Sequence, residues 1–348
     1  MRKAFFILLI FFVILRVLLS LQSPNNGKRI RITGTLTTEP REYGTSLLLT
    51  LHGYSFFVPQ NIYILYGSKI VVEGLVKDHD LTQVKIISIH PPTSILSHIR
   101  SKILESINTT FPEPMSSLLA GATIGAPNIP KSFQDKLRST GTSHIVVASG
   151  GNLAILAGFL EISLSKMVKR KIFLPIIALI LLIYSALTGF GAPIVRALIM
   201  WLAIVAVQYT GRVVKLSTIL VLTILIMLLY KPLWLFDVSF QLSIGATTGI
   251  LLLGKKLQRY FKKTPLIRDA LAMSIAAQVG TLPVSLFVFH EFNVLSPFWN
   301  VLVLWTVPYI TIIGMVGSVA TLIFEPLGKA LFLVSYPFCW YFVKIVML

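Results

Sequence analysis

The sequence predicts a mainly α-helical polytopic membrane protein that carries a small all-β domain after its first helix. Hydrophobic residues make up 55% of the 348 residues and charged residues only 13%, against about 25% charged in an ordinary globular domain. The mean hydropathy is +0.81. Apolar segments recur after residue 144, whereas residues 28–92 contain short alternating runs. These observations exclude a water-soluble fold and a disordered chain.

Positive charge is in excess along the chain. The 31 Lys and Arg residues stand against 13 Asp and Glu residues, which gives a net charge of +18. This excess predicts anionic partners, namely lipid headgroups, nucleic acid or both. The single cysteine, Cys339, has no intrachain disulfide partner and no clustered ligands for a structural zinc. We therefore expect no metal site and no cofactor.

Residues 1–22 form the predicted N-terminal transmembrane anchor. Residues 4–21 are apolar except for Arg16 and follow a basic start. No small-x-small cleavage site follows this stretch, and about 18 residues are enough to span a bilayer. We therefore expect an uncleaved helix whose basic N-terminus stays in the cytoplasm.

Residues 28–92 form the predicted β-domain. Its runs of β-branched or alternating residues are separated by breaks that contain glycine. The runs cover residues 28–38, 46–51, 54–58, 69–77 and 82–90. A small barrel of about five strands is often an OB-fold, which commonly binds oligonucleotides, although other small β-domains share this strand pattern. We expect an OB-like domain here.

Residues 144–348 form the predicted transmembrane domain, which gives about nine spans when the first helix is included. Its segments are residues 144–165, 172–190, 193–209, 216–230, 233–254, 266–289, 297–323 and 330–348. With the N-terminus inside, Lys and Arg gather in the inner loops, as the positive-inside rule requires. This topology predicts a multi-pass protein of a phospholipid membrane with an extracytoplasmic β-domain.

Residues 93–143 connect the β-domain to the spans. Residues 94–108 and 131–139 mix apolar and charged side chains at helical spacing, which is typical of helices that lie along a membrane interface. Residues 115–126 are small and apolar but too short to cross a bilayer. This segment is either re-entrant or simply buried.

Polar side chains recur along two of the predicted spans. One line contains Asp237, Gln241, Gly245 and Thr248, and the other contains Ser274, Gln278, Thr281 and Ser285. Steps of three and four residues place each set on one helix face. Such lines form hydrated paths in some membrane proteins and helix-to-helix hydrogen bonds in others. The sequence leaves both readings open.

Arg196 lies near the outer end of its predicted span and remains charged there. It needs a salt-bridge partner such as Asp237, a route to the surface, or an anion. In an earlier span, glycine at position 150 weakens the helix start, so exposed amides there can meet an anion. Packing is the alternative, because Gly150, Ala154 and Gly158 form a face of small residues.

A serine hydrolase is an alternative function. Ser149 with His144 or His290 supplies a hydroxyl and a base, and the sequence partly resembles the Gly-x-Ser-Gly motif of rhomboid proteases, with Val147 at the first glycine position. The sequence has no paired carboxylates, no His-x-x-x-His and no nucleotide-binding loop. We therefore expect no catalytic residues. A small-molecule permease is a further alternative, although the chain has no convincing internal repeat.

An ordered series of motifs runs through residues 94–325. The series is Phe111-Pro112-Glu113-Pro114, Leu118-Leu119-Ala120-Gly121, Gly141-Thr142-Ser143-His144, Ser149-Gly150, Leu187-Thr188-Gly189-Phe190, Arg196-Ala197, Gly211-Arg212, Phe240-Gln241-Leu242-Ser243, Ala276-Ala277-Gln278, Thr281-Leu282-Pro283, Asn300 and Pro308. In this order the motifs resemble the competence domain of the ComEC family, whose members are membrane channels for DNA internalisation in natural transformation. The β-domain and the first span resemble the usual leader of that family.

The resemblance implies that residues 144–348 form a channel that takes one DNA strand across the bacterial cytoplasmic membrane. The residues expected along this path are Ser149, Gly150, Asn152, Arg196, Asp237, Gln241, Gln278 and Asn300. Arg196 is expected to meet phosphate near the outer mouth, while amides and hydroxyls replace water around the moving backbone.

In the outer domain, DNA binding is expected from basic side chains and one aromatic ring, because single strands are held by positive charge and by stacking. The expected residues are Lys28, Arg29, Arg31, Arg41 and Tyr54. Phe56 and Phe57 point to opposite faces of a strand, so at least one of them belongs to the core.

Two departures from the family limit what the resemblance implies. Longer relatives often add a metallo-β-lactamase-like domain, and this sequence has no His-x-His-x-Asp-His cluster. We therefore expect no enzyme activity and separate partners, namely a nuclease, a DNA receptor and a cytoplasmic motor or strand-binding protein. Gly151-Asn152 stands where the family usually has Leu-His, although asparagine also donates and accepts hydrogen bonds. A homo-oligomer is compatible with these expectations.

Overall fold

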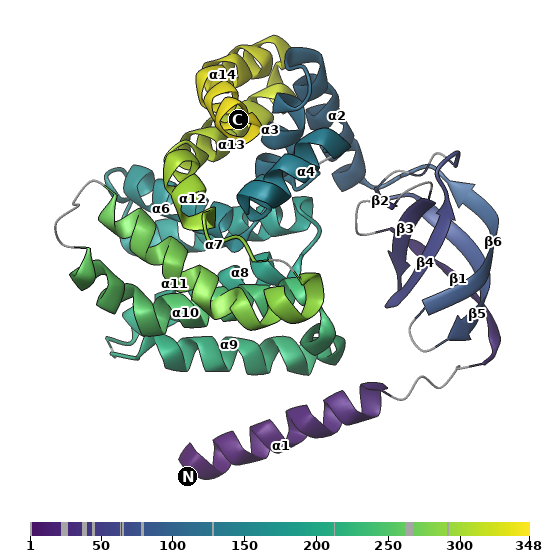
Figure 1. Ribbon diagram of the computed structural model, residues 1–348, viewed down its shortest axis with the longest axis horizontal. Coiled ribbons are helices and arrows are strands. Elements are labelled where there is room, and N and C mark those ends of the chain that lie inside the picture. Colours follow the sequence, from purple (N-terminus) through teal and green to yellow (C-terminus); the bar gives the residue numbers. More distant parts are fainter. Residues whose placement is uncertain are drawn as a thin grey trace. The chain divides into compact units, whose positions relative to one another are not determined.

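The structure is a computed structural model of the chain, and it divides into two compact units (Figure 1). The larger unit contains Met1–Val17 and Ile103–Leu348, and the smaller unit contains Leu18–Lys102. The structure describes residues 2–21, 27–36, 40–43, 46–62, 64, 66–77, 80–126, 129–211, 213–261, 267–290 and 292–348.

The smaller unit contains a six-stranded sheet with the order β1-β5-β6-β4-β3-β2. The strands are β1 (Arg29–Thr35), β2 (Arg41–Tyr43), β3 (Ser46–Leu51), β4 (Tyr54–Pro59), β5 (Lys69–Lys77) and β6 (Asp80–His90). Neighbouring strands are antiparallel except for β4 and β6, which are parallel. The first predicted run corresponds to β1, which pairs with β5, whereas β2 lies outside the predicted runs and pairs with β3. Consecutive segments of the chain therefore form the two edges of the sheet.

Alternating side chains give this sheet one buried face. Leu49 on β3 and Ile70 on β5 are at most 1% exposed, as the two-residue period of a strand requires. On β4, Phe56 is 1% exposed and Phe57 is 55% exposed, which confirms that one of these two rings belongs to the core. Tyr54 is partly buried against the same core.

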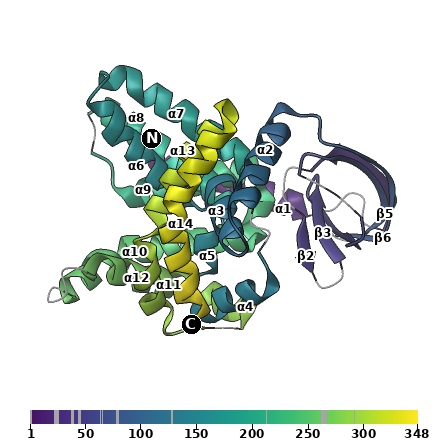
Figure 2. The same cartoon turned by 90° about the horizontal axis from the view of Figure 1, so that it is seen from above.

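The larger unit is helical (Figures 1 and 2). Its elements, with α1 and α2 extending into the smaller unit, are α1 (Arg2–Leu21), α2 (Ile95–Thr110), α3 (Met115–Ile124), α4 (Lys131–Thr140), α5 (Ser143–Val146), α6 (Gly150–Ser165), α7 (Arg170–Leu187), α8 (Ala192–Tyr209), α9 (Leu216–Tyr230), the 3₁₀-helix η1 (Pro232–Phe236), α10 (Val238–Tyr260), α11 (Arg268–Val284), the π-helix η2 (Ser285–Phe289), α12 (Ser296–Leu304), α13 (Val307–Ile323) and α14 (Glu325–Met347).

Four of the described helical segments are long and apolar enough to cross a membrane, namely α7, α8, α11 with η2, and α14. The bent pair α12 and α13 gives a fifth if it counts as one span. Shorter apolar helices include α3, α6 and α9. These helices occupy the predicted segments, while the count of nine spans and the orientation stay predictions.

Apolar side chains lie exposed along the outside of these helices. On α7 they are Ile172, Ile176, Leu179, Leu182 and Ile183, each at least 41% exposed. An apolar surface of this extent on a soluble protein would associate or aggregate, whereas a lipid bilayer covers it without cost. The exposure pattern therefore supports membrane insertion.

Two of the predicted spans are broken into separate helices. The segment 144–165 divides because α5 ends at Val146 and α6 begins at Gly150. The segment 297–323 bends by 47° between α12 and α13. Pro308 occupies the first turn of α13, where its missing N–H leaves no helical hydrogen bond unmade. The weakened helix start expected at Gly150 marks the first break, whereas the continuous apolar run concealed the second.

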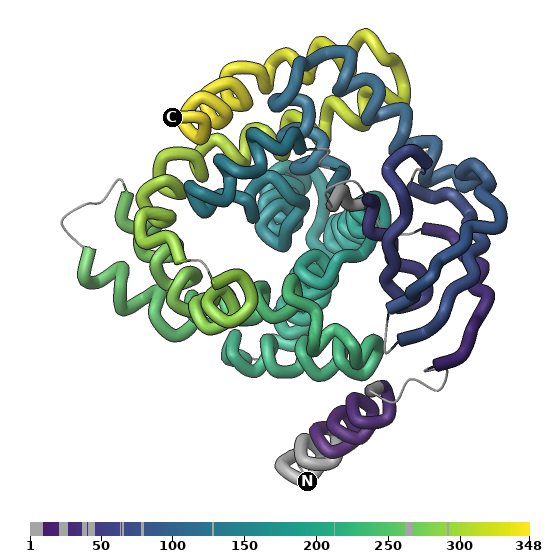
Figure 3. The backbone as a smooth tube through the Cα atoms, turned by 45° about the vertical axis from the view of Figure 1, so that its right-hand side comes forward, coloured from purple at the N-terminus to yellow at the C-terminus, as the bar shows by residue number. Residues whose placement is uncertain are grey.

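The short apolar segment after residue 114 is a buried helix. All ten residues of α3 are buried, while the choice between a re-entrant and a simply buried segment stays a prediction. Helix α13 lies against it, because a Cβ on Gly314 would overlap Thr123 and Leu119. Helices α13 and α14 run side by side as an antiparallel pair, drawn in yellow-green and yellow in Figures 2 and 3.

Helices α10 and α11 approach each other through glycine backbones. A Cβ on Gly245 would lie 2.5 Å from the carbonyl oxygen of Gly280, and a Cβ on Gly280 would overlap the backbone of Gly245 and Gly249. Small residues allow such close contact between membrane helices, where lipid supplies no hydrophobic driving force. This part of the predicted polar line therefore packs against a helix through glycine backbones, which neither the hydrated path nor the helix-to-helix hydrogen bonds anticipated.

Replacing Gly280 by alanine should destabilise the helical unit. The added methyl group overlaps the backbone of α10, and overpacking of this kind costs about 1–3 kcal/mol. Thermal unfolding of the purified protein in detergent measures the effect. Gly158→Ala is the matched control, because a Cβ there meets nothing within 4 Å and alanine favours a helix by about 1 kcal/mol. Equal melting temperatures for the two variants would contradict the glycine contact.

Candidate functional site

The junction between α5 and α6 places Ser149 at a helix start. Ser149 is the N-cap of α6, and its Oγ accepts a hydrogen bond from the Gly151 amide at 3.2 Å. The same hydroxyl donates to Asn152 Oδ1 at 3.4 Å. Serine is preferred at this position because its oxygen satisfies an amide that has no partner within the helix. The Ser149 hydroxyl is thus engaged locally.

Asn152 joins α6 to α3 and α7. Its side chain is 2% exposed, and Nδ2 donates to the carbonyl oxygen of Ala122 at 3.1 Å. The Tyr184 hydroxyl donates to the same carbonyl at 3.5 Å. Close by, a Cβ on Gly125 would lie 3.1 Å from Ala148 Cβ. Asn152, Ala122 and Tyr184 come from three segments that are distant in sequence, and they meet at the start of α6.

Arg196 extends from the first turns of α8 to the same junction. A Cβ on Gly150 would lie 3.0 Å from Arg196 Nη2 and 3.0 Å from the Pro193 carbonyl oxygen, so the absence of a side chain at Gly150 makes room for the guanidinium. Arg196 Nε is buried and has no hydrogen-bond partner. The structure does not pair Arg196 with Asp237, whose Oδ1 instead accepts from the Phe240 amide at 2.9 Å.

A second polar cluster joins α11, α12 and the end of α4. Asn300 is 6% exposed, and its Nδ2 donates to Ser274 Oγ at 2.8 Å and to Ser296 Oγ at 3.4 Å. The Ser296 hydroxyl donates to the carbonyl oxygen of Gly141 at 3.3 Å. Asn300 Oδ1 is buried without a partner. Gln278, one turn after Ser274, donates to the carbonyl of Asn293, which in turn donates to Ser139.

Asp237 and Gln241 lie together at the start of α10. Asp237 is exposed and caps the helix, while Gln241 Nε2 donates to the Leu235 carbonyl at 2.9 Å. The predicted path residues thus form three groups. The first group is Ser149, Gly150, Asn152 and Arg196, which lie together. The second is Gln278 and Asn300, which do not bond to each other but belong to the cluster around α11 and α12. The third is Asp237 and Gln241, at the start of α10.

The outer-domain predictions fall on the β-sheet unit. Lys28, Arg29 and Arg31 are exposed, and Arg29 lies 3.9 Å from Glu73. Tyr54 packs partly against the core. Arg41 lies on β2, and its side chain is outside the described residues.

Further basic side chains belong to the same face of the sheet. Arg31, Glu73 and Lys85 are direct partners across β1, β5 and β6, and Thr35 and Lys69 are partners on the same face. Lys69 and Lys85 are exposed. Sequence reasoning missed both lysines because the strand register that places them on the same face as Arg31 is not visible in a single sequence.

Comparison with known proteins decides the family. The sequence profile of the competence proteins matches residues 123–348 of this chain. The chain belongs to the competence protein family. The matched range includes each predicted path residue of the helical unit, whereas the β-sheet unit lies before it. The predicted relation to the ComEC family is confirmed, and together with the apolar helices it indicates a membrane protein.

Two relatives of this competence protein are similar over 64% and 62% of the chain. ComE operon protein 3 of Bacillus subtilis (strain 168) is 28% identical over 224 residues, which are 64% of this chain and 28% of that protein. Uncharacterized protein YcaI of Escherichia coli (strain K12) is 26% identical over 231 residues, which are 62% of this chain and 30% of that protein. The chain thus spans less than a third of each relative. No solved structure matches it.

Replacing Asn152 tests the contact that joins α3, α6 and α7. Asn152→Leu removes the donor to the Ala122 carbonyl and should lower the free energy of unfolding by about 1–3 kcal/mol. Asn152→His keeps a ring N–H donor and should retain more of the stability. Thermal unfolding in detergent measures both. If the leucine variant is as stable as the parent, Asn152 does not hold this junction together.

Proposed function

We propose that this chain forms a membrane channel through which single-stranded DNA crosses the bacterial cytoplasmic membrane during natural transformation. Membership of the competence family and the similarity to ComE operon protein 3 support a role in DNA uptake. The apolar helices and the basic face of the β-sheet unit suit the two tasks of crossing a bilayer and binding a polyanion.

The surroundings of Arg196 provide the observation on which the channel proposal rests. A guanidinium with a buried, unpartnered Nε lies against the first residue of α6. The N-terminal end of a helix carries a partial positive charge, so it adds to the charge of the arginine instead of neutralising it. Arg196 and this helix end together favour an anion with several acceptor oxygens, such as a phosphodiester.

Uncharged polar groups extend the proposed route beyond Arg196. Asn152, Gln278 and Asn300 present amides, and Asn300 Oδ1 has no partner of its own. Amides and hydroxyls exchange hydrogen bonds with a moving sugar-phosphate chain at little cost, as the polar lining of other channels does for ions. In this proposal they replace the water that surrounds the strand outside the membrane.

The orientation and the partners follow from the charge distribution of the chain. We place the N-terminus in the cytoplasm and the β-sheet unit outside, because Lys and Arg gather in alternate loops. The parallel pairing of β4 with β6 and the sheet edges made of consecutive segments support an OB-like barrel. A separate nuclease, a DNA receptor and a cytoplasmic motor or strand-binding protein complete the system.

The serine hydrolase alternative has less support. Ser149 Oγ caps α6 and hydrogen-bonds to Asn152, and within the described part of the chain no histidine hydrogen-bonds to it. A nucleophilic serine needs such a base. We therefore assign Ser149 to the proposed path and to the start of α6.

Arg196→Gln should impair DNA entry without affecting DNA capture. The change removes the positive charge that faces phosphate, and losing one charged hydrogen bond of about 1.4 kcal/mol corresponds to about a tenfold effect. Cells that lack the gene are complemented with each variant, and surface-bound and nuclease-resistant cytoplasmic DNA are scored separately with labelled DNA.

Lys215→Gln is the control for the loss of one positive charge, because Lys215 is exposed at the start of α9. It should leave entry unchanged. Immunoblots of membrane fractions correct for the amount of protein. If Arg196→Gln admits as much DNA as the parent at equal abundance, the role of Arg196 in the channel proposal is wrong.

The double change Arg31→Gln and Lys85→Gln should weaken binding of single-stranded DNA. Both residues lie on the exposed basic face of the sheet. Two lost phosphate contacts should also reduce the salt dependence, by about 0.7 per contact in the slope of log K against log salt. Fluorescence anisotropy of a labelled oligonucleotide with the full chain in detergent measures both. Lys166→Gln with Lys169→Gln, on the α6–α7 loop, removes the same charge and should change neither.

A further inference from the structure

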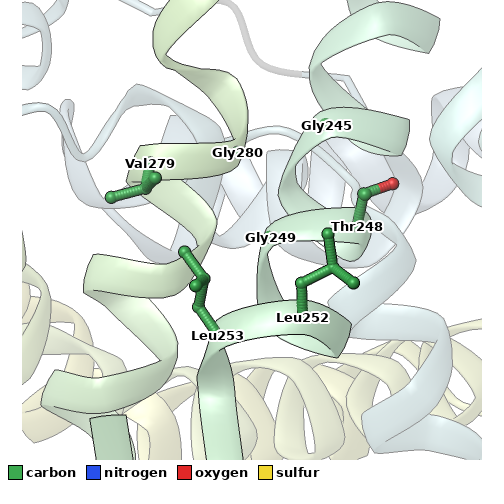
Figure 4. Close-up of a pocket in the computed structure, with 7 residues that line it drawn as sticks. All are labelled: Gly245, Thr248, Gly249, Leu252, Leu253, Val279 and Gly280. Carbon is green, nitrogen blue, oxygen red and sulfur yellow. The ribbon is translucent and has the colours of Figure 1, made fainter. Parts of the chain in front are cut away.

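A groove with a volume of about 370 Å³ runs along the outside of the α10 and α11 pair (Figure 4). Its floor is formed by Gly245, Gly249 and Gly280, the glycines through which the two helices touch. Thr248, Leu252 and Val279 line its sides. Because glycine has no side chain, the groove persists as long as the two backbones stay in contact.

The groove is apolar and faces outward. Leu252 is 72% exposed and Val279 is 48% exposed, and α11 with η2 is one of the segments apolar enough to cross a membrane. Water gains no hydrogen bonds from leucine and valine side chains, so this surface is suited to a hydrocarbon occupant. An extended acyl chain has the width and chemistry to fill a groove of this kind.

Positive charge lies directly beyond the groove on the same face of α10. With 3.6 residues per turn, Lys256 follows Gly249 and Leu253 along the helix, and Arg259 flanks it one turn further. Neither side chain has a hydrogen bond or an ion pair among the described residues, and both are exposed. By contrast, the cation at the start of α11 has an ion-pair partner, because Arg268 lies 2.9 Å from Asp269.

The apolar groove and the unneutralised charges are one helical turn apart. The four residues from Leu252 to Lys256 rise about 6 Å along the helix axis. In a phospholipid, the phosphate lies a similar short distance from the ends of the acyl chains at the glycerol. Tyr260, which is 81% exposed on the same face, is a residue type that concentrates at the membrane-water interface.

We propose that the groove between α10 and α11 binds one anionic phospholipid. An acyl chain lies over Gly245, Gly249 and Gly280, and the phosphate is held by Lys256 and Arg259. Charge complementarity decides between possible occupants. Another transmembrane helix would fill the apolar groove but leave both cations unpaired, and a nucleic acid would pair with the cations but leave the groove empty. The site is separate from the residues proposed to contact DNA.

Lipid-dependent thermal stability of the purified full chain tests this site. The protein is delipidated in a mild detergent and titrated with dioleoyl phosphatidylglycerol, dioleoyl phosphatidylcholine, glycerol phosphate or a single-stranded oligonucleotide. We expect phosphatidylglycerol to raise the melting temperature at the lowest concentration, because a ligand that binds only the folded state stabilises it. Glycerol phosphate lacks the acyl chains and should have little effect.

Single variants identify the contacts of the headgroup. Lys256→Gln and Arg259→Gln should each raise the phosphatidylglycerol concentration for half the stabilisation about tenfold, which corresponds to about 1.4 kcal/mol. Lys215→Gln is the matched control, because it removes the same charge at an exposed position before α9 that does not line the groove. Lys256→Arg keeps the charge and should bind as the parent does, even if Lys256→Gln fails to fold.

Three results would overturn the proposal. Equal stabilisation by phosphatidylcholine and phosphatidylglycerol would show that charge plays no part. An equal loss in Lys215→Gln and Lys256→Gln would show diffuse attraction instead of a site. Stabilisation by the oligonucleotide that displaces phosphatidylglycerol would assign these cations to nucleic acid.

Discussion

Close backbone contact at glycine positions is the constraint on which the helical unit depends. In a bilayer, apolar side chains gain nothing from leaving lipid for protein, so helices associate through packing and hydrogen bonds. Gly280 against α10, Gly314 against α3 and Gly150 against α8 each occupy a point where a methyl group would collide with a neighbour. At Gly150 this closeness also has a chemical result, because it allows the Arg196 guanidinium to reach the first turn of α6. Packing and the candidate site thus share one requirement.

Helix positions could be read from the sequence where an apolar run has the length of the helix. The predicted segments 193–209 and 216–230 became α8 (Ala192–Tyr209) and α9 (Leu216–Tyr230) almost unchanged. The run 297–323 was predicted as one span but forms two helices. Hydropathy gives the length of an apolar run and not the point where backbone hydrogen bonding stops. Pro308 fits the first turn of α13, but Pro175 and Pro337 lie inside helices that continue, so proline alone does not locate the break.

The candidate site was predictable in its residue types and less so in its geometry. A charged side chain in an apolar segment is unusual enough to identify Arg196 from the sequence, whereas Asn152 and Asn300 were expected only from the family resemblance. Their partners came from tertiary structure: Asn152 bonds to a backbone carbonyl of α3, and Asn300 bonds to Ser274 from a different helix. Gly245 was grouped with polar residues by spacing, whereas its role is to let α11 approach. A periodic pattern defines a helix face without revealing what that face contacts.

In the proposed channel, the shortness of α6 and α9 would affect the membrane itself. These helices contain 16 and 15 residues, which rise about 24 Å and 22 Å, whereas the hydrocarbon core of a bilayer is about 30 Å thick. A bilayer adapts to short apolar segments by thinning around them. For a polyanion, the energetic barrier is the low-dielectric layer, so a thinner layer beside the site leaves fewer phosphates without water at any moment. In the proposed channel, α6 and α9 would thus reduce the amount of water that a passing DNA strand loses.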